Sequence, residues 1–175
     1  MTYAVVAFPK LDARDIRNIG LFRAQYDVVN HALIEPHFTL VFPTDLLSYA
    51  DLVTEIRQRA SDVAAFWFAL RCAMVHKDAF ASDYHVFLVP DEGNSRFVKL
   101  HDLLYGERLL PALRTDIDYI PHLTVATLPD VRRCRELAQE WNIDEMEIAG
   151  RIDEIAIVRL DGSAVERMVT IRLYE

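Results

Sequence analysis

The segment "PHFTLVFP", residues 36–43, recurs half a chain later as "PHLTVATLP", residues 121–129. Both copies begin with Pro-His-apolar-Thr-apolar and end with a proline. From the amino-acid composition, the four-residue core of this pattern should arise by chance roughly 0.006 times in a chain of this length. Two copies therefore indicate an internal duplication, and we expect each copy to form a β-strand.

Alternation along a strand predicts which side chains of each copy share a face, because residues i and i+2 point to the same side. One face should carry a histidine, a threonine and a small apolar residue: His37, Thr39 and Val41 in the first copy, and His122, Thr124 and Ala126 in the second. The other face should hold Phe38, Leu40 and Phe42, or Leu123, Val125 and Thr127. If the two strands face one another, both histidines and both threonines meet in one cleft.

The rest of the chain predicts an α+β fold. Strands are expected at 3–9, 65–76 and 83–90 and in a hairpin around Asp161-Gly162, and helices after Asp12 and at about 45–60, 95–110 and 131–141. A strand and a helix precede each motif copy, and a helix follows it. We therefore predict one domain over residues 1–175, with motifs at 37–40 and 122–125. It should be a bilobal, pseudo-two-fold duplication of intertwined lobes, each a small, mainly antiparallel sheet covered by helices, with a central groove between them.

Apolar residues at helical spacing predict the buried face of each helix. Asp12 is expected to cap the first helix. The predicted core positions are Ile16, Ile19, Phe22, Tyr26 and Val29 in the first helix, Tyr49, Leu52, Val53 and Ile56 in the second, Phe97, Leu100, Leu103 and Leu104 in the third, and Val131, Cys134, Leu137, Ala138 and Trp141 in the fourth.

Composition narrows the classes of partner. The formal net charge of −8 argues against binding long nucleic acid through its phosphates, which requires a basic surface. The two cysteines have no metal-ligand spacing and fit a reducing compartment as free thiols. The sequence shows no pattern typical of a secretory leader, a membrane-spanning helix or a glycine-rich nucleotide-binding loop. We expect a cytoplasmic monomer with no membrane association and no cofactor.

Paired histidines and threonines suit phosphoryl chemistry. Histidine titrates near pH ~6.5, so one ring can act as a base while the other acts as an acid. Threonine hydroxyls on a stiff strand can donate hydrogen bonds to phosphate oxygens. This set of groups needs no metal.

The motifs "HFTL" and "HLTV", each opening a strand in one half of a chain of this size, resemble those of the 2H phosphoesterase superfamily. That superfamily includes bacterial 2′-5′ RNA ligase-like proteins and 2′,3′-cyclic nucleotide phosphodiesterases. The resemblance implies that His37 and His122 are the acid–base pair and that Thr39 and Thr124 contact phosphate. It implies a metal-independent enzyme acting on 2′,3′-cyclic phosphates of nucleotides or short RNA ends, or on 2′-5′ linkages. Which histidine is the base stays open.

Two other functions fit the same residues. The cleft could bind a nucleotide or RNA end without catalysis, or His37 and His122 could hold Zn²⁺. The remaining histidines are interpreted as structural, although His85 could line the groove. Packing or ion pairing is the preferred role for the candidate base-stacking and phosphate-binding side chains, which are Tyr3, Phe80 and Tyr84 and Arg71, Arg96 and Arg114. The acidic runs Asp91-Glu92 and 144–147 are expected to be solvated.

Overall fold

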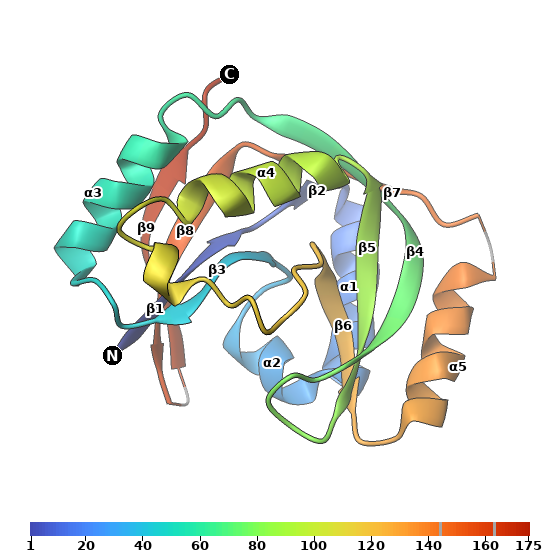
Figure 1. The fold of residues 1–175 in the computed structure, drawn as a ribbon. Coiled ribbons are helices and arrows are strands. Elements are labelled where there is room, and N and C mark those ends of the chain that lie inside the picture. Colours follow the sequence, from blue (N-terminus) through green and yellow to red (C-terminus); the bar gives the residue numbers. More distant parts are fainter. Residues whose placement is uncertain (144, 163) are drawn as a thin grey trace.

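A computed structural model describes residues 1–143, 145–162 and 164–175. Two antiparallel sheets lie side by side (Figure 1). The first has the strand order β3-β1-β8-β9, with bounds Phe38–Thr44, Thr2–Ala7, Glu154–Asp161 and Ala164–Arg172. The second has the order β2-β7-β4-β5-β6, with bounds Lys10–Leu11, Ile148–Ile152, Phe66–Lys77, Tyr84–Glu92 and Leu123–Leu128. The predicted α+β class with two small antiparallel sheets is confirmed.

Both motif segments form edge strands. β3 is the outermost strand of the first sheet and β6 is the outermost strand of the second. In Figure 1 both lie toward the middle of the molecule. The chain crosses between the sheets four times, from β1 to β2, from β2 to β3, from β3 to β4 and from β7 to β8. One apolar core contains buried side chains from both sheets. The motif strands are thus held within a single packed unit.

Five α-helices complete the described architecture. They are α1 (Ala13–Tyr26), α2 (Val28–Leu33), α3 (Tyr49–Ala60), α4 (Asn94–Leu104) and α5 (Val131–Asn142), with a short 3₁₀ helix at Leu110–Ala112. The predicted cap is confirmed, because the carboxylate of Asp12 accepts a hydrogen bond from the backbone N–H of Arg14 at 2.8 Å. Ser48 and Asp130 cap α3 and α5 in the same way.

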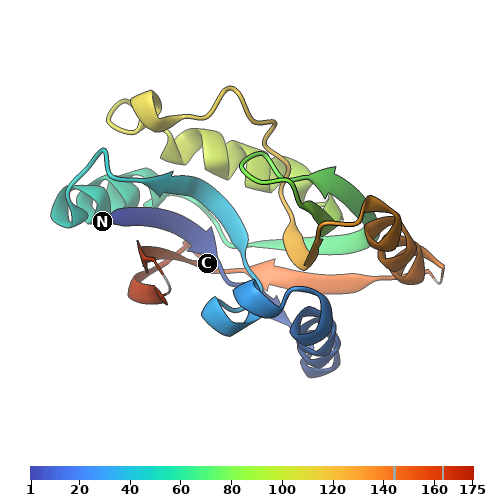
Figure 2. The same ribbon diagram turned by 90° about the horizontal axis from the view of Figure 1, so that it is seen from below.

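The helices before the motif strands are exchanged between the sheets. α1 precedes β3 in the chain but packs against β6, whereas α4 precedes β6 but packs against β3. Figure 2 shows α1 and α4 on opposite sides of the two sheets. Each motif strand is therefore covered by a helix from the other half of the chain.

Two of the core positions predicted for the first helix are wrong, and both lie near the groove. Ile19 of α1 is buried, but Ile16 and Val29 are 51% and 72% exposed. The side chains of α1 that turn inward include Asp15 and Arg23, because this helix faces the polar end of the groove as well as the core. The first helix also ends at Tyr26, so Val29 lies on α2 and not in the predicted stripe.

Other predictions hold with local changes. Leu103 and Val131 are exposed: His101 takes the inward position of the last turn of α4, and Val131 is the first residue of α5. The run before the Asp161-Gly162 turn divides at Asp153 into β7 and β8, which belong to different sheets. The hairpin β8–β9 is confirmed, with Gly162 at φ 54°, while Ser163 lies outside the described residues.

Candidate active site

Each motif strand contains a bulge at the same place. In β3, Thr39 pairs with Val6 and Val41 pairs with Val5, so that Leu40 is an extra residue. In β6, Thr124 pairs with Phe87 and Ala126 with Val86, so that Val125 is the extra residue. The bulge therefore follows the histidine by three positions in both copies, and such bulges re-aim the side chains beyond them.

The bulges overturn part of the predicted alternation. Val41 and Ala126 were expected beside the histidines, but both are fully buried in the core. Phe42 and Thr127 were expected in the core. Instead, Phe42 lines a cavity together with Thr39, and the Thr127 hydroxyl faces His85. The groove face of each copy thus follows the spacing i, i+2, i+5.

The two motif histidines are anchored in the same way. Nδ1 of His37 lies 2.8 Å from the carbonyl oxygen of Glu35, and Nδ1 of His122 lies 2.5 Å from the carbonyl oxygen of Ile120. A carbonyl oxygen can only accept, so Nδ1 of each ring carries the hydrogen. In the neutral rings Nε2 is then the unprotonated nitrogen, available to take a proton.

Burial favours the neutral form of both rings. Burial lowers the pKa of His37, and the nearby Arg23 charge lowers it further. Burial lowers the pKa of His122 to about 4, with a smaller contribution from the charge of His37. Loss of water disfavours the charged imidazolium in both cases. An anion bound beside either ring would favour its protonated form.

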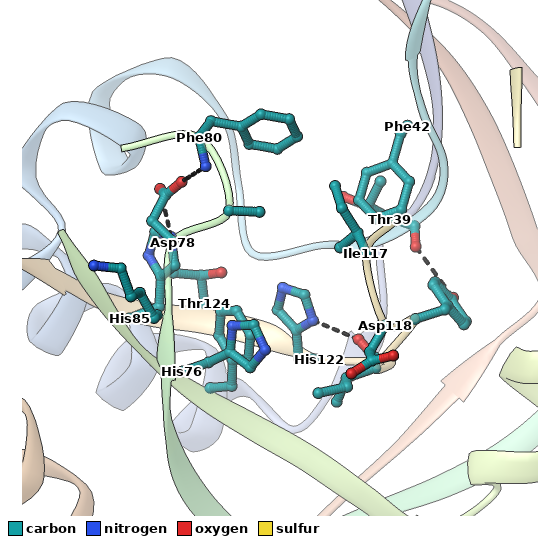
Figure 3. Close-up of a pocket in the computed structure, with 15 residues that line it drawn as sticks. Thr39, Phe42, His76, Asp78, Phe80, His85, Ile117, Asp118, His122 and Thr124 are labelled. Carbon is teal, nitrogen blue, oxygen red and sulfur yellow. Dashed lines mark hydrogen bonds and ion pairs between the residues drawn. The ribbon is translucent and has the colours of Figure 1, made fainter. Parts of the chain in front are cut away.

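Two adjoining cavities bring the predicted site residues together. A cavity of about 170 Å³ is lined by Thr39, His122 and Thr124, and a second of about 180 Å³ is lined by His37 and again by Thr124. Figure 3 shows Thr39 and Phe42 on one side of the first cavity, His85 and Thr124 on the other, and His122 between them. We define the two cavities together as the groove. All four predicted residues line it.

An aromatic stack underlies His122. Its ring lies 3.6 Å from that of Phe87 between centroids, at an interplanar angle of 15°. The rings of His76 and His85 flank Phe87 at 5.2 and 5.4 Å. Apolar side chains complete this end of the first cavity, among them Phe42, Phe80 and Ile117. The His122 end of the groove is thus aromatic.

Buried charge lies at the His37 end. Nε of Arg23 donates to Asp27 at 3.2 Å, and both side chains are almost inaccessible. Asp27 also accepts from Asn30 and from the Thr127 hydroxyl, at 2.7 and 2.8 Å. Because the Thr127 hydrogen is directed to Asp27, its oxygen accepts from Nδ1 of His85 at 3.1 Å.

This network extends across the groove through His85. Its Nε2 lies 2.8 Å from the carboxylate of Asp78, which can only accept. Both ring nitrogens of His85 therefore lie within hydrogen-bond distance of an oxygen that can accept. His76 and His85 both line the first cavity, although the sequence alone favours a structural role for both. The two residues are direct cross-strand partners in β4 and β5. A predicted hairpin centred on 77–84 would have paired them and so placed both on the same face of the sheet.

Helix α4 and the segment before β6 hold the bulge of β3. Nδ1 of His101 lies 2.8 Å from the carbonyl oxygen of Leu40, and the N–H of Phe42 donates to the Tyr105 hydroxyl at 2.9 Å. The Tyr119 hydroxyl donates to the carbonyl oxygen of Thr39 at 3.1 Å. His101 is buried, and burial lowers its pKa. These contacts satisfy backbone groups of the edge strand β3 at and beside its bulge.

The alternative site residues have other partners. Arg71 forms ion pairs with Asp91, Glu92 and Glu147, so the two acidic runs meet at one cation; Asp144 lies outside the described residues. Arg114 pairs with Asp116 and lies over the ring of Phe80.

Of the three aromatic candidates, only Phe80 lines the first cavity, whereas Tyr3 and Tyr84 pack against the core. Arg96 donates to the carbonyl oxygen of Ala64. Within the described part of the chain, no three histidine, cysteine or acidic side chains gather closely enough to bind a metal ion. None of the described helices is both long and apolar enough to span a bilayer.

The chain resembles known proteins in sequence and in fold. A family model described as the 2′-5′ RNA ligase superfamily matches residues 8–164. A Bacillus pumilus protein named "Putative phosphoesterase" is 32% identical over 128 residues, which covers 72% of this chain and 70% of that protein.

Solved structures share the fold at low identity. Escherichia coli LigT, in a complex with 3′-AMP, has a TM-score of 0.65 at 12% identity and covers 99% of this chain and 98% of its own. Usb1 of Kluyveromyces marxianus has a TM-score of 0.61 at 13% identity and covers 98% of both chains. The family model spans most of the chain and both motif strands. The chain therefore belongs to the 2′-5′ RNA ligase superfamily, the 2H phosphoesterases.

Proposed function

We propose that this protein hydrolyses the 2′,3′-cyclic phosphate of a nucleotide or a short RNA end, or a 2′-5′ linkage, by acid–base catalysis with His37 and His122. The observation that carries the proposal is the equal anchoring of the two motif histidines, each through Nδ1 to the carbonyl two residues earlier. This arrangement leaves both Nε2 atoms available for proton transfer beside a shared pair of cavities.

In the proposed reaction each histidine moves one proton. Nε2 of one ring takes a proton from water as the water oxygen forms a bond to phosphorus. The bond between phosphorus and one ribose oxygen breaks, and Nε2–H of the other ring delivers a proton to that oxygen. The products are a phosphate monoester and a free ribose hydroxyl. Joining of two ends is the same chemistry in reverse.

Thr39 and Thr124 hold the phosphate in this proposal. Their hydroxyls come from the two facing motif strands and line the first cavity together. Neutral donors placed on strands can stabilise charge that builds up on phosphate oxygens without having to reorganise. The aromatic end beside His122 offers faces on which a nucleobase can stack.

The comparisons support a nucleotide ligand. Relatives in fold have been solved with nucleotides bound, LigT with 3′-AMP and Usb1 with uridine monophosphate. Phosphate monoesters of this kind are what ring opening of a cyclic phosphate would yield. A nucleotide with one phosphate therefore suits the proposed reaction as its product.

A second candidate is a module that binds nucleotide ends without turnover. The low pKa of His122 favours it, because a ring that is neutral at pH 7 cannot donate a proton to a leaving group. In the catalytic proposal, the anionic phosphate itself raises the pKa of one ring when it binds. The two candidates therefore differ in whether substrate is consumed.

The test is turnover of a panel of 2′,3′-cyclic nucleotides and a short RNA with a cyclic end, in the presence of EDTA. We expect product with the wild type and with His31→Gln, which alters an exposed histidine on α2. His37→Gln and His122→Gln should each lower kcat by roughly 10²–10⁴. Binding without product would support the module, and a loss of activity in EDTA would point to a histidine metal site.

A further inference from the structure

Arg23 is a buried cation with an unused hydrogen-bond donor. It projects from α1, has 1% of its surface exposed, and donates through Nε to Asp27. Its Nη1 is also buried and has no hydrogen-bond partner among residues 1–143, 145–162 and 164–175. A buried N–H without an acceptor costs free energy. An acceptor supplied by a ligand would remove that cost.

The position of Arg23 identifies the kind of ligand. Arg23 lines the second cavity, whose other polar walls are Asp27, Asn30, His37, His85 and Thr124. Asp27 is already engaged by Arg23, Asn30 and Thr127, and His85 by Thr127 and Asp78. The donors left for a ligand in the described lining include the Nη1 of Arg23 and the Thr124 hydroxyl. Two donors beside His37 suit an anion with several oxygen acceptors.

Arg23 reaches the second cavity because its helix, α1, packs against the motif strand of the other half of the chain. α1 packs across β6, and the bulge in β6 turns Thr127 toward Asp27 and His85, which line the groove. The Thr127 hydroxyl then holds Asp27, and Asp27 holds the guanidinium. Arg17, an exposed arginine six residues earlier on the same helix, contributes nothing to this network.

We propose that Arg23 binds a non-bridging oxygen of the substrate phosphate through Nη1, in a subsite completed by Thr124 and His37. This inference rests on the proposed function for the identity of the ligand, a phosphate ester. The phosphate then lies where the two cavities meet at Thr124, with Arg23 on the side of the second cavity and Thr39 on the side of the first. The aromatic part of the first cavity receives the nucleoside. An arginine presents planar N–H donors that match phosphate oxygens, which a lysine ammonium cannot reproduce.

The test compares ligands with and without phosphate. Calorimetric titrations of 3′-AMP and adenosine would be made with the wild type, Arg23→Lys, Arg23→Gln and the control Arg17→Lys. We expect both Arg23 variants to bind 3′-AMP roughly 10–100-fold more weakly, as expected for a lost hydrogen bond to a charged group, with adenosine binding unchanged. Arg17→Lys should match the wild type. Equal loss for both ligands, or no loss, in folded Arg23 variants would overturn the proposal.

Two further measurements separate this inference from folding effects and from the proposed function. The side-chain ¹⁵N resonances of Arg23 in the wild type, assigned through bonds, should shift with 3′-AMP and not with adenosine, whether or not the variants fold. Unshifted resonances would contradict the subsite.

Rp and Sp phosphorothioates of the cyclic substrate then report on turnover. The ratio of the turnover rates for the Rp and Sp isomers should be closer to one in Arg23→Lys than in the wild type. A wild type that binds 3′-AMP through Arg23 but turns over nothing would keep the subsite and reject the hydrolase.

Discussion

The two motif strands have the same backbone design and different surroundings. Immediately before β3 and β6 lies a histidine anchored to the carbonyl two residues earlier, and a threonine and then a bulge follow it in each strand. Beside His37 lie the buried Arg23 and Asp27, whereas His122 lies on the ring of Phe87. A duplicated strand thus repeats the reactive groups, and the neighbouring elements give each copy its own environment.

The difference extends to the second position after each bulge. In β3 this residue is Phe42, which lines the aromatic cavity. In β6 it is Thr127, whose hydroxyl holds Asp27 and accepts from His85. The same backbone position is apolar in one copy and polar in the other. The groove therefore has an aromatic end and a charged end, which matches a ligand made of a base and a phosphate.

The largest effect should come from removing both histidines. If the two rings act as one acid–base unit, His37→Gln/His122→Gln should lose little more activity than either single variant, which we expect to be down by roughly 10²–10⁴. The measurement is kcat on a cyclic nucleotide for the four proteins in parallel. Additive losses in the logarithm of kcat would indicate that the two halves act independently.

The next effect should distinguish the two threonines. Thr124 lines both cavities, whereas Thr39 does not line the cavity that contains His37 and Arg23. A hydroxyl lost from a charged phosphate should cost roughly 10–100-fold in kcat/KM. We expect Thr124→Val to reach the upper part of this range and Thr39→Val the lower part. The reverse order in steady-state kinetics would place the phosphate in the aromatic cavity.

The pH dependence of stability should report on the burial of both histidine rings. Because the pKa of His122 falls from 6.5 to about 4 on folding, the unfolded chain binds the proton more readily. The contribution of this group to the free energy of unfolding is therefore constant above pH 6.5. It decreases as the pH falls toward 4, by at most about 1.4 kcal/mol per pH unit. In His122→Gln, the free energy of unfolding measured with urea should depend less steeply on pH in this interval. His37→Gln should act with the same sign, and an unchanged slope in both would contradict the burial of the rings.

The smallest effect should come from the rings beneath the histidines. Phe87 stacks closely on His122, while Phe8 lies 6.1 Å from His37 at a tilt of 55°. An aromatic pair contributes about 0.5–1.5 kcal/mol, so Phe87→Leu should lower kcat by roughly 2–10-fold. Phe8→Leu should leave kcat nearly unchanged. Similar losses in the two variants would show that the stack does not position His122.

Local sequence patterns determined much of this protein. The repeated Pro-His-apolar-Thr segments identified both strands of the groove, and helical spacing located α3, α4 and α5 with buried positions such as Leu52, Phe97 and Leu137. The Asp161-Gly162 pair predicted the hairpin. These features depend on periodicity and turn chemistry within a few residues, which a sequence carries directly.

Only the tertiary structure decided how the two copies differ. A bulge depends on the pairing of two strands, so Phe42 and Thr127 could not be assigned to the groove by alternation alone. The roles of Arg23 and Asp27 arise because α1 crosses to β6, a long-range contact that leaves Ile16 exposed and buries charge instead. The repeated motif could be recognised from neighbouring residues alone, whereas the polarity at each end of the groove depends on elements distant in the chain.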